Sequence, residues 1–290
     1  MVANANDGTN RAPYLRCDID GGNLFDLPPE SSGPKGEERA VLQAVKAAGF
    51  EGVQGASIAL CRELGLGCTF STRINEPAEA DAHAATCADA GYDCVTLHVG
   101  WGIEDDDKVY ALVDAVLTAS ERRGIPLYIE THRATITQDI WRTVQIVRRF
   151  PDVRFNGDFS HWYTGLEMVY GGFEAKVDFA APVFERVRFI HGRIGNPGAI
   201  QVDIGDGSGR TYVDHFREMW TRSFAGFLRT AKPGDYICFT PELLHSQIYY
   251  ARLIKNASGK LVEESDRWTQ ALLYVQIARG CFEEAKKKRA

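Results

Sequence analysis

Short apolar runs of strand length alternate with longer segments of helical period along nearly the whole chain. The pattern predicts eight strands, over residues 14–20, 52–57, 68–73, 94–100, 125–131, 153–161, 187–195 and 236–243. It predicts helices near residues 37–48, 58–65, 76–90, 105–122, 137–149, 174–185 and 215–231. Strands that alternate with helices over short connections are typical of βαβ units, and eight such units indicate a closed barrel. We therefore predict an α/β fold, a single (β/α)8 TIM barrel.

The length of 290 residues agrees with one barrel, which typically needs about 250. We expect a flexible N-terminal arm over residues 1–13 and the barrel domain over residues 14–290. Two predicted connections, 21–36 and 195–214, are longer than usual and follow strands on the face where barrels carry their active sites. We expect 195–214 to close over the mouth as a lid that reaches substrate with Gln201 and Asp203. Packing against a second subunit is the alternative.

Composition and charge narrow the classes of partner. The net charge of −6 argues against nucleic acid, because phosphate binding usually needs a basic face. No apolar run approaches the roughly 20 residues that cross a bilayer, so no membrane partner is expected. Seven cysteines without a C-x-x-C spacing favour a reducing cytoplasm over a disulfide framework. A homo-oligomer remains open.

Four successive predicted strands each end in a potential metal ligand. These residues are Glu130, Asp158, His191 and Glu242. The carboxyl ends of barrel strands converge at one mouth, so the four side chains should meet there. Any one of them alone could be a rim ion pair, a helix cap or a core histidine, but four together favour a metal site. Three carboxylates and one imidazole suit Mn²⁺ or Mg²⁺, with Zn²⁺, Co²⁺ or Fe²⁺ less favoured.

The order Glu, Asp-x-x-His, His, Glu on the last four strands resembles the xylose-isomerase-like TIM barrel superfamily, and within it the sugar phosphate isomerase/epimerase family. The likeness extends from Tyr14 to about Ile254. It includes the stretches ETHR (130–133), DFSHWYTG (158–165) and HGRIGNPG (191–198). The resemblance implies that the metal ligands are Glu130, Asp158, His191 and Glu242, and that His161 contacts the substrate. Arg193 departs from the ketose 3-epimerases, whose substrate-binding arginine lies further beyond the metal-binding histidine.

Other polar side chains at strand ends are candidates for substrate contact. Arg193 and His161 could neutralise charge that grows on a substrate oxygen. His98 ends the strand predicted at 94–100, and His132 follows Glu130 by two residues. Both histidines are candidate substrate ligands, with packing of the loops as the alternative.

These residues together favour proton transfer next to a carbonyl. A divalent cation that binds a carbonyl and an adjacent hydroxyl stabilises the enediolate left when the α-proton departs. Glu130 and Glu242 can flank the substrate, remove a proton from one face and return it to the other. We therefore predict a metal-dependent isomerase or epimerase of a sugar or keto-sugar, a small-molecule carbohydrate substrate.

Three other functions remain as alternatives. With a leaving group β to the carbanion, the same residues would act as a metal-dependent lyase or dehydratase on a keto-sugar or 3-keto-glycoside. A phosphodiesterase of the endonuclease IV type would need about three metal ions and a basic groove, which seven histidines and a net charge of −6 do not favour. A sugar-binding barrel without catalysis would have no use for two glutamates at a metal.

Overall fold

In the computed structural model, which describes residues 2–288, eight parallel strands close into a barrel. The strands are β2 (Tyr14–Asp20), β3 (Gly52–Gln54), β4 (Gly67–Ile74), β5 (Val95–Val99), β6 (Leu127–Glu130), β7 (Phe155–Asn156), β8 (Val187–Gly192) and β9 (Asp235–Pro241). Each pairs with the next in parallel, and β9 pairs with both β8 and β2, which closes the ring. The predicted single TIM barrel is confirmed.

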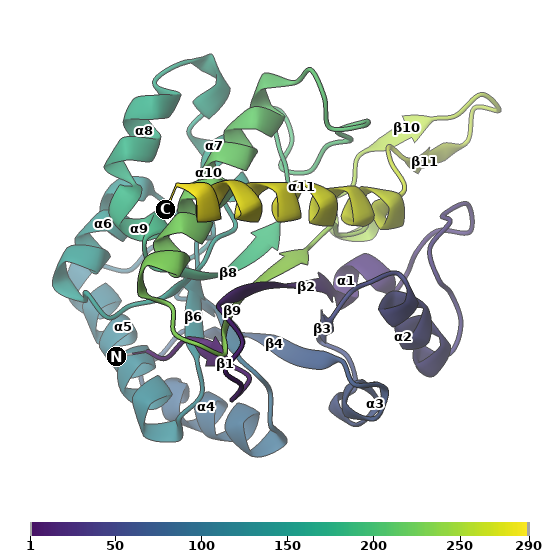
Figure 1. Cartoon of the computed structure of the whole chain (residues 1–290). Helices are drawn as coiled ribbons and strands as arrows, with labels where there is room; N and C mark the ends of the chain where they lie inside the picture. The colour runs from purple at the N-terminus through teal and green to yellow at the C-terminus, as the bar shows by residue number, and fades with distance from the viewer. Residues whose placement is uncertain (1, 289–290) are drawn as a thin grey trace.

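Helices surround the strands on the outside of the barrel (Figure 1). The longer ones are α2 (Glu38–Ala47), α3 (Ile58–Leu64), α4 (Glu79–Ala90), α5 (Asp106–Arg123), α6 (Ile140–Arg149), α8 (Phe173–Phe179), α10 (Thr211–Thr230) and α11 (Arg267–Lys287). Short helical turns are α1 (Gly21–Leu24), α7 (Ser160–Gly165), η1 (Met168–Tyr170), α9 (Ala181–Phe184) and η2 (Ser246–Ile248). Capping residues set the two ends of α5. The Asp105 side chain accepts a hydrogen bond from the Lys108 amide at the start, and Gly124 ends the helix with a φ of 65°.

Two predicted elements differ in extent from those observed. The strand predicted at 153–161 is only the two-residue β7, because helix α7 already begins at Ser160. The helix predicted at 174–185 is divided into α8 and α9 at Ala180. Pro182 lies in the first turn of α9, where a residue needs no N–H to form the helix. In the interior of one continuous helix from 174 to 185, the same proline would lack a backbone hydrogen bond, so the helix is divided before it.

The chain beyond β9 contains structure that the sequence pattern does not predict. A hairpin of β10 (Leu253–Lys255) and β11 (Leu261–Glu263) projects from the body of the barrel (Figure 1). Helix α11 follows and lies alongside α10. It buries the side chains of Trp268, Tyr274 and Phe282. This helix completes the outer layer next to β9.

Part of the segment 1–13, predicted to be a flexible arm, has a defined place across the N-terminal ends of the strands. The two-residue strand β1 (Ala5–Asn6) pairs antiparallel with the start of β9. The Val2 side chain is 3% exposed, and the Ala5 amide donates to the Tyr128 hydroxyl at 2.9 Å. Residues 2–6 therefore close the bottom of the barrel, because they add buried apolar surface and hydrogen bonds there.

The connection 195–214 is held by contacts with the chain after β9. The Gln201 amide accepts from the Leu244 N–H at 2.9 Å and donates to the Leu244 carbonyl at 3.0 Å. Ile204 is fully buried, and its N–H donates to the Gln270 side chain. The Gln201 side chain is therefore engaged with the chain after β9, and the predicted contacts of Gln201 and Asp203 with a substrate stay predictions. Closure of this loop as a lid stays a prediction.

All seven cysteines are buried free thiols, in agreement with the predicted absence of disulfides. Over residues 2–288, none of the helices combines the length and the apolar character that spanning a bilayer requires.

Candidate metal centre

The structure brings the four predicted ligands together at the carboxyl ends of the strands. Glu130 ends β6, Asp158 follows β7, His191 lies in β8 and Glu242 follows β9. One ligand atom from each residue lies within 4.8 Å of the others. The side chains of the first three are at most 1% exposed, and that of Glu242 is 13% exposed. The arrangement is a buried centre that opens toward solvent on the side of Glu242.

The His191 ring is held by two amide side chains. The Gln54 Nε2 donates to the Phe70 carbonyl at 3.3 Å, which directs Gln54 Oε1 toward His191 Nε2 at 2.7 Å. Asn156 Oδ1 accepts from the His191 N–H, so its NH₂ group faces His191 Nδ1 at 2.9 Å. Because an amide oxygen needs a donor, the proton of the neutral ring lies on Nε2. Nδ1 then faces Asn156 Nδ2 together with the carboxylate oxygens of Glu130 and Glu242, at 3.2 and 3.4 Å, inside the centre.

The carboxylates are held in orientation by different partners. Glu130 Oε2 accepts from Asn156 Nδ2 at 3.0 Å and lies 3.2 Å from His191 Nδ1. Asp158 Oδ1 accepts from the N–H and hydroxyl of Ser160, at 3.0 and 2.5 Å. Two other oxygens, Glu130 Oε1 and Glu242 Oε2, are buried and accept no hydrogen bond, although His98 Nε2 lies 3.2 Å from the first and Arg193 Nη2 lies 3.0 Å from the second. Unsatisfied buried carboxylate oxygens are costly, so these two are suited to a cation.

The charge of the centre fits a divalent cation. Its fixed charges are the carboxylates of Glu130, Asp158 and Glu242 and the guanidinium of Arg193, which is 1% exposed. Coordination of a cation by Nδ1 requires a neutral His191, and three negative charges and one positive charge then give the residues around the cation a net charge of −2. A Mn²⁺ or Mg²⁺ ion would neutralise this charge with mainly oxygen ligands.

The pKa shifts show the same excess of negative charge. Burial lowers the pKa of His191, but Glu242 and Glu130 outweigh burial and raise it to about 10. Burial and then Glu242 raise the pKa of Asp20, at the end of β2, to about 7. Burial also raises the pKa of Glu242, whereas His98 and His191 overcome burial and hold the pKa of Glu130 well below its usual range. The chain alone therefore leaves the centre short of positive charge.

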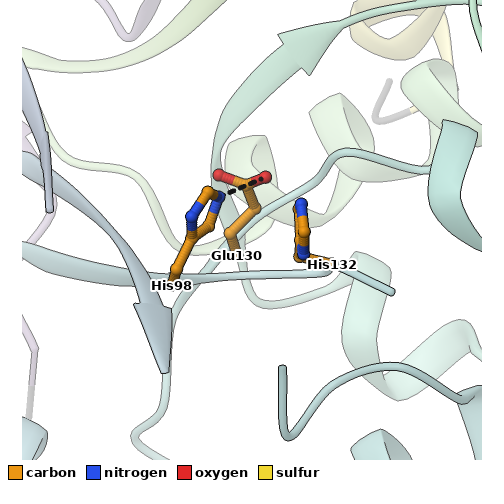
Figure 2. Close-up of side chains that lie close together, drawn as sticks. All are labelled: His98, Glu130 and His132. Carbon is orange, nitrogen blue, oxygen red and sulfur yellow. Dashed lines mark ion pairs between the residues drawn. The ribbon is translucent and has the colours of Figure 1, made fainter. Parts of the chain in front are cut away.

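Three histidines form a row beside the centre. The ring centroids of His98 and His132 are 4.3 Å apart, and those of His132 and His161 are 3.9 Å apart. Figure 2 shows His98 and His132 on the two sides of the Glu130 carboxylate, with His98 Nε2 at 3.2 Å from Glu130 Oε1. His161 Nε2 lies 3.4 Å from Asp158 Oδ2. All three histidines, which together with Arg193 were the candidates for substrate contact, therefore lie at the centre.

His132 is a hydrogen-bond donor toward this space. Burial and then the neighbouring His161 lower the pKa of His132 to about 2, so the ring is neutral. Its Nδ1 accepts from the Ala134 N–H at 3.0 Å, which leaves the proton on Nε2. His98, Glu130 and His132 are also close enough to hold a metal ion. The protonated Nε2 of His132 suits a substrate oxygen better than a metal.

Arg193 connects two of the candidate ligands. Its Nη2 contacts Asp158 Oδ2 and lies 3.0 Å from Glu242 Oε2, and its Nε donates to the Ser160 hydroxyl at 3.1 Å. The guanidinium carbon lies 4.6 Å from the centre of the Tyr250 ring. Its Nη1 is buried without a hydrogen-bond partner, so the two N–H donors of this atom remain available for a substrate.

Sequence reasoning missed Gln54, Asn156 and Tyr250 as parts of this site. Gln54 is the last residue of β3, so its polar side chain at a strand end was a usable signal. Asn156 lies two residues before Asp158, inside the segment already singled out. Tyr250 comes from the loop after β9, and nothing in the sequence pattern marks it. Gln54 and Asp20 also line an adjoining pocket of about 290 Å³ with aromatic walls from Phe25 and Phe70.

No protein-family model and no curated protein sequence matches this chain. Among solved structures, a xylose isomerase-like TIM barrel protein from Mycobacterium smegmatis in complex with magnesium is similar at a TM-score of 0.55 and 14% identity, over 97% of this chain and 99% of that one. The probable 3-DHS dehydratase AsbF, involved in petrobactin synthesis in Bacillus anthracis, has a TM-score of 0.53 and 13% identity, over 80% of this chain and 94% of that one. At these identities the likeness concerns the fold. The chain has the fold of the xylose isomerase-like TIM barrel proteins, as the order of its strand-end residues predicts.

Proposed function

We propose that this protein is a divalent-metal-dependent enzyme that isomerises or epimerises a sugar or keto-sugar. The observation that carries the proposal is the buried convergence of Glu130, Asp158, His191 and Glu242, in which Gln54 holds the Nε2 side of His191 so that Nδ1 faces the centre. Mn²⁺ or Mg²⁺ is the proposed cation, because oxygen ligands predominate. The magnesium in the similar barrel from Mycobacterium smegmatis supports this choice by analogy.

The proposed roles of the side chains follow from their positions. When bound, the cation would polarise a substrate carbonyl and the neighbouring hydroxyl. Glu130 and Glu242 reach the centre from β6 and β9, with two strands between them, and would exchange a proton with the two faces of a bound substrate. Arg193 and His132 supply N–H donors to substrate oxygens, and His98 and His161 complete the wall.

A metal-dependent lyase is the second candidate. The same proton removal would expel a group β to the carbonyl of a keto-sugar or 3-keto-glycoside. The probable dehydratase among the similar barrels supports this candidate by analogy of fold. Arg193, whose Nη1 has no hydrogen-bond partner, could stabilise a departing oxygen as well as a carbonyl oxygen.

Proton exchange with solvent separates the two reactions. The metal-loaded protein would be incubated in D₂O with free sugars, keto-sugars and 3-keto-glycosides. Deuterium in an intact isomeric sugar supports the isomerase or epimerase, and release of an aglycone or of water supports the lyase. If the metal-loaded protein converts none of these substrate classes, both assignments are contradicted.

Replacing each glutamate tests its role in proton transfer. Glu130→Gln and Glu242→Gln keep an oxygen for the cation but cannot transfer a proton at neutral pH, so we expect turnover to fall by about 10²–10⁴-fold. Metal content, measured by elemental analysis, should fall much less. Glu30→Gln is the control, because Glu30 is exposed and has only a 4.0 Å contact with Lys260. A variant with near-normal turnover would remove that glutamate from the mechanism.

A further inference from the structure

A cluster of arginines lies at the end of the barrel opposite the metal centre. Arg154 immediately precedes β7, and Arg188 is the second residue of β8. Together with Arg186 and Arg229 they line a hollow of about 150 Å³, where Glu185 is the one carboxylate. The lining therefore carries four positive charges and one negative charge. This contrasts with the net charge of −6 of the whole chain.

The two most buried of these arginines have no carboxylate partner among the described residues. Arg154 is 8% exposed, and its Nη1 donates to the carbonyls of Pro151 and Val153. Its Nε is buried without any hydrogen bond. Arg188 is 2% exposed and donates to the Asn4 side chain at 2.7 Å and to the Thr230 hydroxyl at 3.0 Å. Neutral oxygens thus hold both guanidinium groups without neutralising them.

Nearby carboxylates are already engaged. Glu185 is shared between Arg229, at 2.9 Å, and Arg186, at 3.7 Å. Both oxygens of Asp235 accept hydrogen bonds from the side chains of Asn4 and Asn6 and from the Lys232 amide. Asp152 and Asp235 act to raise the pKa of Arg154 and Arg188 from a distance, but among the described residues neither forms an ion pair with them. Four guanidinium groups therefore face Glu185 alone in the lining of the hollow, and this excess of positive charge favours an anion.

The pKa directions agree with this excess of positive charge. Burial and then Arg186 lower the pKa of Arg154. Burial and then Arg154 lower the pKa of Arg188 to about 10. Mutual repulsion of buried guanidiniums is an unfavourable term that a bound anion would relieve.

We propose that this hollow binds an oxyanion of the phosphate class, held by Arg154, Arg186 and Arg229. Planar guanidinium groups match the oxygens of a phosphate in pairs, and such charge-assisted hydrogen bonds are strong. A volume of about 150 Å³ admits one small oxyanion. A larger hollow of about 540 Å³ shares Arg154 and Thr230 with it and gives room for the rest of a phosphorylated molecule.

This site is separate from the metal centre. Arg188 precedes His191 by three residues on the same strand, a Cα separation of about 10 Å at the usual strand rise. Their side chains also lie at opposite ends of the barrel. The anion therefore acts as a structural or regulatory ligand and does not take part in proton transfer.

Thermal unfolding of the metal-loaded protein tests the site. Inorganic phosphate is compared with chloride at equal ionic strength, so that simple screening cancels. At one hundred times its dissociation constant, phosphate should raise Tm by about 4 °C for a chain of this size. Arg154→Gln should still fold, because it removes a repelling buried charge, and it should lose the phosphate response. Arg186→Gln, at a more exposed position, should weaken the response as well.

The control variant is Arg39→Gln, which removes an exposed ion pair with Glu63 elsewhere on the molecule and should keep the full response. Glycerol phosphate in a parallel series identifies the source of the anion. If glycerol phosphate has a lower dissociation constant than inorganic phosphate, the hollow binds the phosphate group of a larger molecule. If its dissociation constant is equal or higher, the hollow binds the free ion. Equal effects of phosphate and chloride, or an unchanged response in both Arg154→Gln and Arg186→Gln, would overturn the proposal.

Discussion

His132 carries its proton on a single nitrogen between two other imidazole rings, and this placement makes the protein sensitive to acid. Its pKa in the folded protein is lowered to about 2, first by burial and then by His161, whereas an unfolded histidine titrates near 6.5. At a pH between these two pKa values, the unfolded chain binds a proton on His132 that the folded chain does not bind. The free energy of unfolding therefore falls by up to about 1.4 kcal/mol per pH unit as the pH drops below 6.5. Above pH 6.5, His132 is neutral in both states and does not make stability depend on pH.

Denaturant unfolding at pH 6.5 and pH 5 measures this effect. The loss attributable to His132 over this interval is on the order of 2 kcal/mol. His132→Asn should remove most of this loss and flatten the pH dependence, because the amide does not titrate. His83→Asn, on the outer helix α4, is the matched control. Identical pH dependence in wild type and His132→Asn would show that His132 becomes protonated in the folded state.

The candidate ligands were predictable as single residues, but their supporting side chains were not. Glu130, Asp158, His191 and Glu242 each interrupt an apolar strand at its carboxyl end, and strand ends meet in any closed parallel barrel. Gln54 and His191 lie 137 positions apart in sequence, and their contact joins strands β3 and β8. Such a pair depends on the stagger of the strands around the ring, and strand periodicity does not contain that information.

At the level of elements, the segment over residues 2–6 is predicted to stabilise the fold. Deleting residues 1–8 removes strand β1, the buried Val2 side chain and the hydrogen bond from Ala5 to Tyr128. We expect a loss of about 2 kcal/mol, since burying a valine side chain alone contributes roughly 1.5–3 kcal/mol. For a chain of this size, Tm should fall by about 3 °C, measured by calorimetry.

The control for this deletion is Asn10→Ala, in the exposed part of the same segment. Its Tm should match that of the wild type. An unchanged Tm after deletion of residues 1–8 would restore the interpretation of this segment as a flexible arm.

The eight barrel strands were predictable because buried parallel strands form continuous apolar runs. Helix α11 was not, although it has 21 residues. Its buried side includes the polar residues Arg267 and Gln270, which interrupt its apolar stripe. Arg267 donates to the carbonyls of Gly22 and Asp26, so its burial serves the loop after β2. A contact of this kind is set by the tertiary fold and leaves no periodic signal.

At the scale of the whole molecule, charge is separated between the two ends of the barrel. The candidate metal centre has three carboxylates against Arg193, and the hollow at the other end has four arginines against Glu185. The net charge of −6 is the sum of such regions and predicts neither of them. Exclusion of nucleic acid as a partner therefore stays a prediction from the sequence, as does a homo-oligomer.

Metal binding should stabilise the whole barrel, because the four candidate ligands come from β6, β8 and the chain that follows β7 and β9. A ligand that binds only the folded state at one hundred times its dissociation constant adds about 2.7 kcal/mol. This corresponds to a rise in Tm of about 4 °C, which a chelator should reverse. Mn²⁺ should act at a lower concentration than Mg²⁺, because it dehydrates more readily and accepts the imidazole nitrogen of His191 better.

The double variant Asp158→Asn/Glu242→Gln separates this centre from adventitious binding, because it removes two of the three negative charges that hold the cation. We expect it to lose the metal-dependent rise in Tm, whereas Glu30→Gln should keep it. The metal-free double variant should fold, since its loss of repulsion among carboxylates offsets the loss of the ion pairs with Arg193. A rise in Tm that persists in the double variant would place the metal elsewhere on the protein and would contradict the proposed centre.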